Sequence, residues 1–154
     1  MDLKLLLPKE HVLCSINAKT RREFLAEMAE ILVQEGTVTD KERFLDAVEH
    51  REDAMTTQSE FGVAFPHASS PVVKRLALVA AVLPEPGFHY DKDQVSPCRV
   101  FFLIAIPAAA PAAHLPLLTH LAEIAMTKSR LDKILRADSV AAVHKLLVTA
   151  PTVR

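Results

Sequence analysis

Seven histidines are the main supply of chemically active side chains in this sequence of 154 residues. A neutral imidazole is a good nucleophile, and an ordinary pKa of about 6.5 leaves most of it neutral near pH 7. His67 directly follows Pro66, at the end of the short apolar run at residues 62–65. Proline has a fixed φ and no N–H, so we expect a strand to end there and to present His67 at its tip. On this segment alone an ordinary surface histidine is the simpler interpretation, although functional groups in α/β folds often lie just past strand ends.

Two other residues, together with His67, form a constellation that a lone surface histidine would not have. Arg51 lies 16 positions upstream, at the predicted end of a helix, and a guanidinium can hold phosphate oxygens by paired hydrogen bonds. His114 starts another predicted helix, after an apolar strand that ends at Pro107. Phosphoryl transfer needs a nucleophile and fixed donors around three equatorial oxygens, which these three side chains supply. The structural alternatives are that Arg51 is only a charge at a helix C-terminus and that His114 only begins its helix.

The remaining histidines show no pattern typical of a metal site. His114 and His120 are six residues apart, which is about 240° around a helix, so their side chains diverge. No pair of carboxylates near His67 has a spacing suited to magnesium. We therefore expect no metal and no cofactor. Surface or structural roles are expected for the other histidines, which are His11, His50, His89, His120 and His144.

The overall composition excludes several classes of protein. Eighteen Lys and Arg residues against 19 Asp and Glu residues give a net charge of −1, which provides no basic surplus for binding nucleic acid. Only three glycines are present, so neither of the glycine-rich nucleotide-binding motifs occurs. The two cysteines, Cys14 and Cys98, lie far apart and form no zinc or disulfide pattern, which favours a reducing compartment.

The apolar segments are too short to span a membrane. The longest, residues 100–113, contains two prolines, whereas a spanning helix needs about 20 apolar residues. The N-terminal sequence MDLKLLLPKE lacks the longer apolar run and the cleavage site of a signal peptide. We expect a cytoplasmic protein without membrane insertion, folded as one domain over residues 1–154.

Helices near both ends of the chain surround strands in the middle. Capping boxes at residues 20–23 (TRRE) and 39–42 (TDKE) predict two helices, the first ending near Gly36 and the second at His50 or Arg51. Continuous apolar runs are typical of strands buried on both faces, which requires helices above and below the sheet. Such runs occupy residues 76–83 and 99–106, and shorter extended segments are expected at 11–16 and 62–65. Residues 84–97 should form a loop, which could hold a short strand at 88–90. Helices are expected at 115–126, 131–135 and 140–148. This order predicts an α/β fold, a three-layer α/β/α sandwich with a central mixed sheet flanked by helices.

The segment from Arg51 to Ala68, REDAMTTQSEFGVAFPHA, resembles the active-site segment of the fructose/mannitol-type (type 2) enzyme IIA domains of the bacterial phosphotransferase system. That group includes the nitrogen-regulatory enzyme IIA-like proteins. The family has an Arg-Glu pair, a Ser/Thr-Thr pair and a Gly-aliphatic-Ala-aliphatic-Pro-His strand at this spacing. A second shared element is an apolar strand that ends in proline, followed by a loop and a His-Leu pair at a helix start, here His114-Leu115.

The resemblance implies roles for individual residues. His67 would be the phosphoryl-accepting histidine, His114 its partner histidine, and Arg51 the cation of the pocket. Further candidates for the phosphoryl pocket, from motif position or hydroxyl chemistry, are Glu52, Thr56 and Thr57. For Thr57, a turn hydroxyl bonded to local backbone is the structural alternative. Three residues depart from glycines that the family often has: Gln58, Glu60 and Ala68. They imply a stiffer loop, in which an inward-pointing Glu60 would repel phosphate.

The function that the resemblance implies is that of a phosphocarrier of the phosphoenolpyruvate-dependent sugar phosphotransferase system. His67 would take a phosphoryl group from the general carrier protein HPr, or a paralogue, and pass it to an enzyme IIB partner. The alternative is a nitrogen-regulatory type of protein, in which phosphorylation of His67 switches binding to a regulatory target. A third possibility is an unphosphorylated relative kept for protein contacts alone. Nucleic acid is not an expected partner, and these motifs encode neither the sugar nor the oligomeric state.

Overall fold

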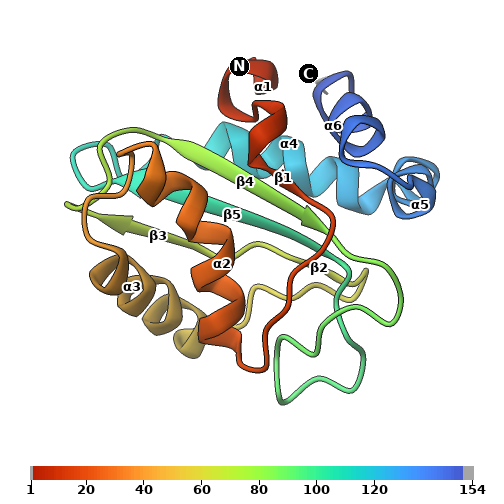
Figure 1. Ribbon diagram of the computed structural model, residues 1–154, viewed down its shortest axis with the longest axis horizontal. Coiled ribbons are helices and arrows are strands. Elements are labelled where there is room, and N and C mark those ends of the chain that lie inside the picture. The colour runs from red at the N-terminus through yellow and green to blue at the C-terminus, as the bar shows by residue number, and fades with distance from the viewer. Residues whose placement is uncertain (1, 151–154) are drawn as a thin grey trace.

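Two long apolar strands form the centre of the sheet in the computed structural model of the chain (Figure 1). These strands, β4 (Ala77–Val82) and β5 (Val100–Pro107), pair antiparallel. On one side β1 (Val12–Leu13) lies parallel to β4. On the other side β2 (Val63–Ala64) and β3 (His67–Ser70) lie parallel to β5. The sheet therefore mixes parallel and antiparallel pairs, as predicted.

Helices cover both faces of this sheet, and Figure 1 shows the resulting three layers. One face packs against α2 (Arg21–Gln34) and α3 (Lys41–Ala54). The other face packs against the helices close to the two chain ends, which are α1 (Leu3–Leu6), α4 (Leu115–Met126), α5 (Lys128–Arg136) and α6 (Val140–Val148). Successive side chains of β5 alternate between the two cores, with Phe101 on the first side and Phe102 on the second. The predicted three-layer α/β/α sandwich is confirmed.

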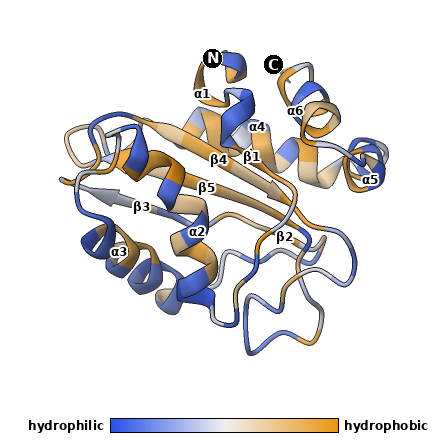
Figure 2. Ribbon diagram, viewed as in Figure 1, coloured by the Kyte–Doolittle hydropathy of each residue, from blue (hydrophilic) through white to orange (hydrophobic). Residues whose placement is uncertain are grey.

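The hydropathy of the chain follows these layers. In Figure 2 the central strands are hydrophobic, while α2, α3 and α5 each carry hydrophilic stretches. The structure describes residues 2–150, so Met1 and residues 151–154 of the predicted domain lie outside the described residues. Within residues 2–150, none of the helices combines the length and apolar character that crossing a membrane requires.

The two predicted helix starts have different outcomes. The capping box at Thr20 is confirmed, since its hydroxyl accepts from the Glu23 N–H and the Glu23 carboxylate accepts from the Thr20 N–H. For α3 the predicted cap at Thr39 is wrong, because Asp40 is the N-cap and accepts from the N–H of Arg43. The Thr39 hydroxyl instead donates to the carbonyl of Val72, a residue 33 positions away. An aspartate caps a helix as well as a threonine does, so α3 loses nothing by starting one residue later.

Other boundaries also shift. α3 continues to Ala54, beyond the predicted end at residue 50 or 51, and α5 begins at Lys128 rather than at residue 131. The short helix α1 has no counterpart in the sequence prediction. Residues 84–97 form a loop, as predicted, but its expected short strand is reduced to a single bridge between Phe88 and Cys98.

The prediction that a strand ends at Pro66 is only half right. β2 does stop before Pro66, but pairing to β5 resumes at His67, which begins β3. Ala64 lies opposite Phe101 and His67 opposite Ile104, so both strands keep one register along β5. Pro66 has no N–H to donate, yet its carbonyl still accepts from Ile104 at 2.9 Å, which allows the ladder to continue. His67 thus lies within an interrupted strand rather than past the end of one.

Candidate active site

His67 has one ring nitrogen held and the other left for chemistry. Its side chain is half-buried at the start of β3, and its Nδ1 lies 2.8 Å from the carbonyl oxygen of Phe65. A carbonyl oxygen can only accept a hydrogen bond, so Nδ1 carries the hydrogen. In the neutral ring Nε2 then holds the free lone pair. This tautomer is the one in which Nε2 is the nucleophile.

The structure brings His114 to His67, as the two motifs predicted together. The ring centroids are 5.5 Å apart and the planes differ by 28°. His114 is the N-cap residue of α4, with no side-chain capping bond. Burial and then the nearby His67 lower the pKa of His114, and the carbonyl of Pro111 only partly opposes this. Its Nδ1 is buried without a hydrogen-bond partner within residues 2–150. Burial therefore favours the uncharged form of the His114 imidazole.

Arg51 lies in the last turn of α3. This placement agrees with the alternative in which Arg51 is a charge at a helix C-terminus. Its Nη1 donates to the carbonyl of Met55 at 2.9 Å, which satisfies an unpaired carbonyl near the end of the helix. Among the described residues, no hydrogen bond or ion pair joins Arg51 to His67 or His114. A guanidinium has five N–H donors, so most of them are not used by Met55.

Glu52, Thr56 and Thr57 form a compact polar cluster that is bonded to the backbone of Phe65. Glu52 is 5% exposed, and its carboxylate accepts from both the N–H and the hydroxyl of Thr57. The hydroxyl oxygen of Thr57 in turn accepts from the Phe65 N–H at 3.2 Å. Thr56 is exposed, with its hydroxyl 3.4 Å from Glu52. Glu52 and Thr57 therefore bond to one another and to backbone, in line with the structural alternative for Thr57.

The three departures from glycine fit the backbone. Among the described residues only glycines have a positive φ, including Gly62 at 76°, so Gln58, Glu60 and Ala68 impose no left-handed strain. Gln58 donates to the carbonyl of Ser96 at 3.0 Å, which ties its loop to the 84–97 segment. Glu60 is exposed, and Ala68 is buried within β3.

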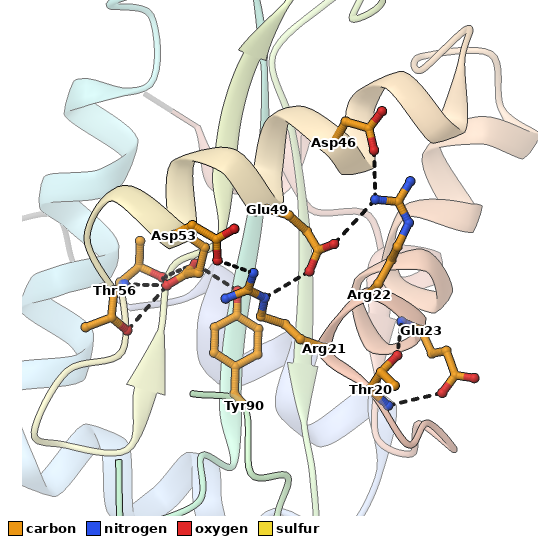
Figure 3. Close-up of polar contacts among 11 residues, drawn as sticks. Thr20, Arg21, Arg22, Glu23, Asp46, Glu49, Asp53, Thr56 and Tyr90 are labelled. Atoms are coloured by element: carbon orange, nitrogen blue, oxygen red, sulfur yellow. Dashed lines mark hydrogen bonds and ion pairs between the residues drawn. The ribbon is translucent and has the colours of Figure 1, made fainter. Parts of the chain in front are cut away.

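Sequence reasoning missed Tyr90. This residue is 2% exposed, and its hydroxyl donates to Glu52 at 2.8 Å. Figure 3 shows its ring pointing toward the C-terminal end of α3, near Arg21 and Thr56. Arg21 pairs there with Glu49 and Asp53, at 3.0 and 2.6 Å. The only signal in the sequence was a lone tyrosine in a loop otherwise rich in Pro and Asp.

No group of three or more His, Cys, Asp or Glu side chains in residues 2–150 is arranged to hold a metal ion. The printed neighbours of the His67 ring are the His114 imidazole and the Phe65 backbone. Neutral and cationic N–H donors suit a phosphoryl group, whose oxygens carry negative charge. The N-terminus of α4 adds a partial positive charge on the side of His114.

The mixed α/β fold, with His67 and His114 side by side at one edge of the sheet, is that of a known family of domains. The family model described as "Phosphoenolpyruvate-dependent sugar phosphotransferase system, EIIA 2" matches residues 5–149. The chain belongs to this family, the type 2 enzyme IIA domains that its motifs resembled.

Three known proteins illustrate the range of this similarity. A PTS system fructose-specific EIIA component of Haloferax volcanii is 29% identical over 146 residues, which cover 95% of this chain and 94% of that protein. A nitrogen regulatory protein of Bradyrhizobium diazoefficiens is 24% identical over 151 residues, covering 98% and 97%. The solved complex of enzyme IIAMTL and phosphorylated enzyme IIBMTL from Escherichia coli has a chain that matches with a TM-score of 0.76. That match has 24% identity and covers 92% of this chain and 96% of the other, and it shows the same fold.

Proposed function

We propose that the chain is a phosphocarrier, which accepts a phosphoryl group on His67 from a phosphorylated HPr-like protein and passes it to an enzyme IIB partner. The observation that carries the proposal is the His67 imidazole itself, with Nδ1–H bonded to Phe65 and Nε2 left with a lone pair beside His114. Membership of the enzyme IIA family and the sugar-specific name of the Haloferax volcanii relative support the same assignment. The IIA–IIB complex from Escherichia coli supports the class of recipient.

The reaction follows from this tautomer. The lone pair of His67 Nε2 forms a bond to phosphorus while the N–P bond of the donor phosphohistidine breaks, and that electron pair returns to the donor imidazole. The Nδ1 hydrogen stays in its bond to the Phe65 carbonyl throughout. The transition state is loose and spreads charge over three oxygens, so donors fixed in advance lower the barrier. His114 supplies one N–H, and the unused N–H groups of Arg51 supply the cationic contact.

The test is intact mass after incubation with phosphoenolpyruvate, enzyme I and HPr. The wild type should gain one phosphate, His67→Ala should gain none, and His114→Ala should gain it more slowly. His50→Ala is the matched control, because His50 lies exposed on α3 and should not affect the gain. ³¹P NMR should place the phosphate on the Nε2 atom. A wild type that gains no phosphate from several HPr sources would overturn the proposal.

A regulatory role is the second candidate, supported by the nitrogen regulatory protein of Bradyrhizobium diazoefficiens. Both candidates begin with phosphorylated His67 and differ in the next step. A sugar carrier should transfer its phosphate to a fructose- or mannitol-type enzyme IIB within the assay time. A regulator should keep its phosphate in the presence of enzyme IIB, and should bind a non-transport target with an affinity that phosphorylation changes.

A further inference from the structure

The hydroxyl of Tyr90 lies far along the chain from His67 but is joined to it by hydrogen bonds. Tyr90 donates to Glu52 Oε2, and the Thr57 hydroxyl donates to the same oxygen, both at 2.8 Å. A buried carboxylate needs such donors, because an unpaired one costs several kcal/mol. Burial, and then the charge of Glu52, raise the pKa of Tyr90, so the phenol keeps its hydrogen and always acts as donor.

The bonds continue from Thr57 to the nucleophile in one direction. A hydroxyl has a single hydrogen, and that of Thr57 is donated to Glu52. The Thr57 oxygen can therefore only accept from the Phe65 N–H, which lies 3.2 Å away. The same Phe65 residue offers its carbonyl to His67 Nδ1 at 2.8 Å. Phe65 lies in the gap between β2 and β3, outside both strands. Its N–H is thus held by a side chain, and that side chain is held by Glu52.

We propose that Tyr90 is a positioning residue for the phosphoryl-accepting His67. It fixes the Glu52 carboxylate, which through Thr57 fixes the Phe65 backbone, and the Phe65 carbonyl then selects the Nδ1–H tautomer. This inference rests on the proposed function for its effect on rate. The effect on the tautomer is independent of the proposed function, because the tautomer exists in the unphosphorylated protein.

The ring and the hydroxyl of Tyr90 have separable roles. The ring packs edge-on against Phe24 and Phe101, with centroids 6.3 and 5.4 Å away. Phenylalanine would keep those contacts, so Tyr90→Phe removes the donor to Glu52 and little else. If Tyr90 were only a core residue, this variant would change stability alone.

The first measurement is ¹⁵N NMR of the His67 ring in uniformly labelled protein, assigned by comparison with His67→Gln. Wild type should show a protonated Nδ1 and an unprotonated Nε2 at pH 8. Tyr90→Phe should show a mixture of the two tautomers. Its rate of phosphorylation at saturating phospho-HPr should fall by about three- to tenfold, the range expected for losing one hydrogen bond. The concentration of phospho-HPr that gives half-maximal rate should not change, because the hydroxyl is buried away from any partner.

Three further variants separate the hydrogen bonds from packing. Phe88→Leu is the matched control: Phe88 lies in the same loop and stacks on Phe24 at 4.5 Å, so the change weakens packing without touching the hydrogen bonds. It should leave the tautomer and the rate as in wild type at temperatures below its melting point. Thr57→Val should reproduce the effect of Tyr90→Phe, whereas Thr57→Ser, which keeps the hydroxyl, should largely restore the wild-type tautomer and rate.

The outcomes separate the two proposals. A wild-type tautomer and rate in Tyr90→Phe would overturn the positioning role. A shifted tautomer in a protein that accepts no phosphate would leave the hydrogen-bond relay in place and overturn the proposed function. Equal rate losses in Phe88→Leu and Tyr90→Phe, with no tautomer change, would assign Tyr90 to packing alone.

Discussion

His11 and His67 lie on opposite edges of one sheet and are held in different ways. His11, next to β1, is 4% exposed, with Nδ1 2.8 Å from the Leu78 carbonyl and Nε2 2.9 Å from the Glu35 carboxylate. His67, at the start of β3, has Nδ1 bonded to the Phe65 carbonyl, whereas its Nε2 has no hydrogen bond within residues 2–150, and its ring stacks against that of His114. An imidazole with both nitrogens bonded contributes to stability and has no lone pair to offer. One with a single fixed nitrogen is oriented and remains reactive.

The largest expected effect on phosphorylation comes from removing the imidazole of His67, which has one ring nitrogen without a hydrogen bond within residues 2–150. His67→Gln should abolish phosphorylation, measured by intact mass. Its free energy of unfolding should change by less than about 1 kcal/mol, because one half-exposed hydrogen bond is lost. A large loss of stability in urea denaturation would show that His67 resembles His11 more than the geometry indicates.

For His11, whose two ring nitrogens are both bonded, we expect a loss of stability and no loss of phosphorylation. His11→Leu leaves two acceptors, on Leu78 and Glu35, without their donor and should lower the free energy of unfolding by about 1–3 kcal/mol. Phosphorylation should proceed at the wild-type rate below the melting temperature, since His11 lies across the sheet from the site. A loss of rate at full folding would contradict the division between the two edges.

Acid should reduce the difference in the free energy of unfolding between wild type and His11→Leu. Burial acts to raise the pKa of Glu35, but its hydrogen bonds from His11 and Thr37 outweigh this, and the pKa is lowered from its ordinary value of 4.5. A lowered carboxyl pKa gives stability that is present above the unfolded value and lost as pH falls through the folded value. Urea denaturation from pH 7 to pH 3 should therefore show a constant gap down to about pH 4.5 and a shrinking one below it. A gap that widens in acid would contradict the role of the Glu35 contact.

A smaller effect is expected at His120, a buried imidazole that lacks a partner. It is 8% exposed, its Nδ1 has no hydrogen bond within residues 2–150, and burial is the main cause of its lowered pKa. The unfolded chain therefore binds this proton more readily, and the wild type loses stability as pH falls below about 6.5. His120→Leu should raise the free energy of unfolding by about 0.5–1.5 kcal/mol at pH 7 and by more at pH 5.5. Thermal melts at both pH values check this, and an equal gain at both would contradict it.

The smallest effect is expected from the exposed carboxylate of Glu60 in the loop before β2. Glu60→Gln should raise the rate of phosphorylation by up to about twofold at low salt, since an exposed charge acts weakly and is screened. The matched control is Glu27→Gln on α2, another exposed glutamate, which should leave the rate unchanged. A gain that persists in 0.5 M salt would argue against simple repulsion.

Much of the fold could be predicted because its signals are local. The apolar runs of β4 and β5, the capping box at Thr20 and the two histidine motifs each lie within a few consecutive residues. The errors came from contacts between distant segments. Thr39 does not cap α3 because its hydroxyl bonds to the distant Val72 carbonyl. β3 forms because β5 extends far enough to pair with the residues that follow Pro66. No local pattern encodes either contact.

The same limit explains why part of the site was missed. His67 and His114 could be paired in advance because the family resemblance covers both. Tyr90 reaches Glu52 across 38 positions, from a loop without periodicity. The roles of Thr57 and Glu52 also depended on side-chain directions, which spacing alone does not give.

The gap at Phe65 and Pro66 has a consequence for the local dynamics of the site. Pro66 has no amide hydrogen, and the Phe65 amide is bonded to the Thr57 hydroxyl rather than to β5. The neighbouring Ile104 amide, by contrast, is bonded across the sheet to the Pro66 carbonyl. Hydrogen–deuterium exchange at Phe65 thus reports opening of the loop, while exchange at Ile104 reports opening of the sheet. The amides of Phe65 and Ile104 are therefore natural probes for whether the segment that carries His67 opens by itself or only when the whole domain unfolds.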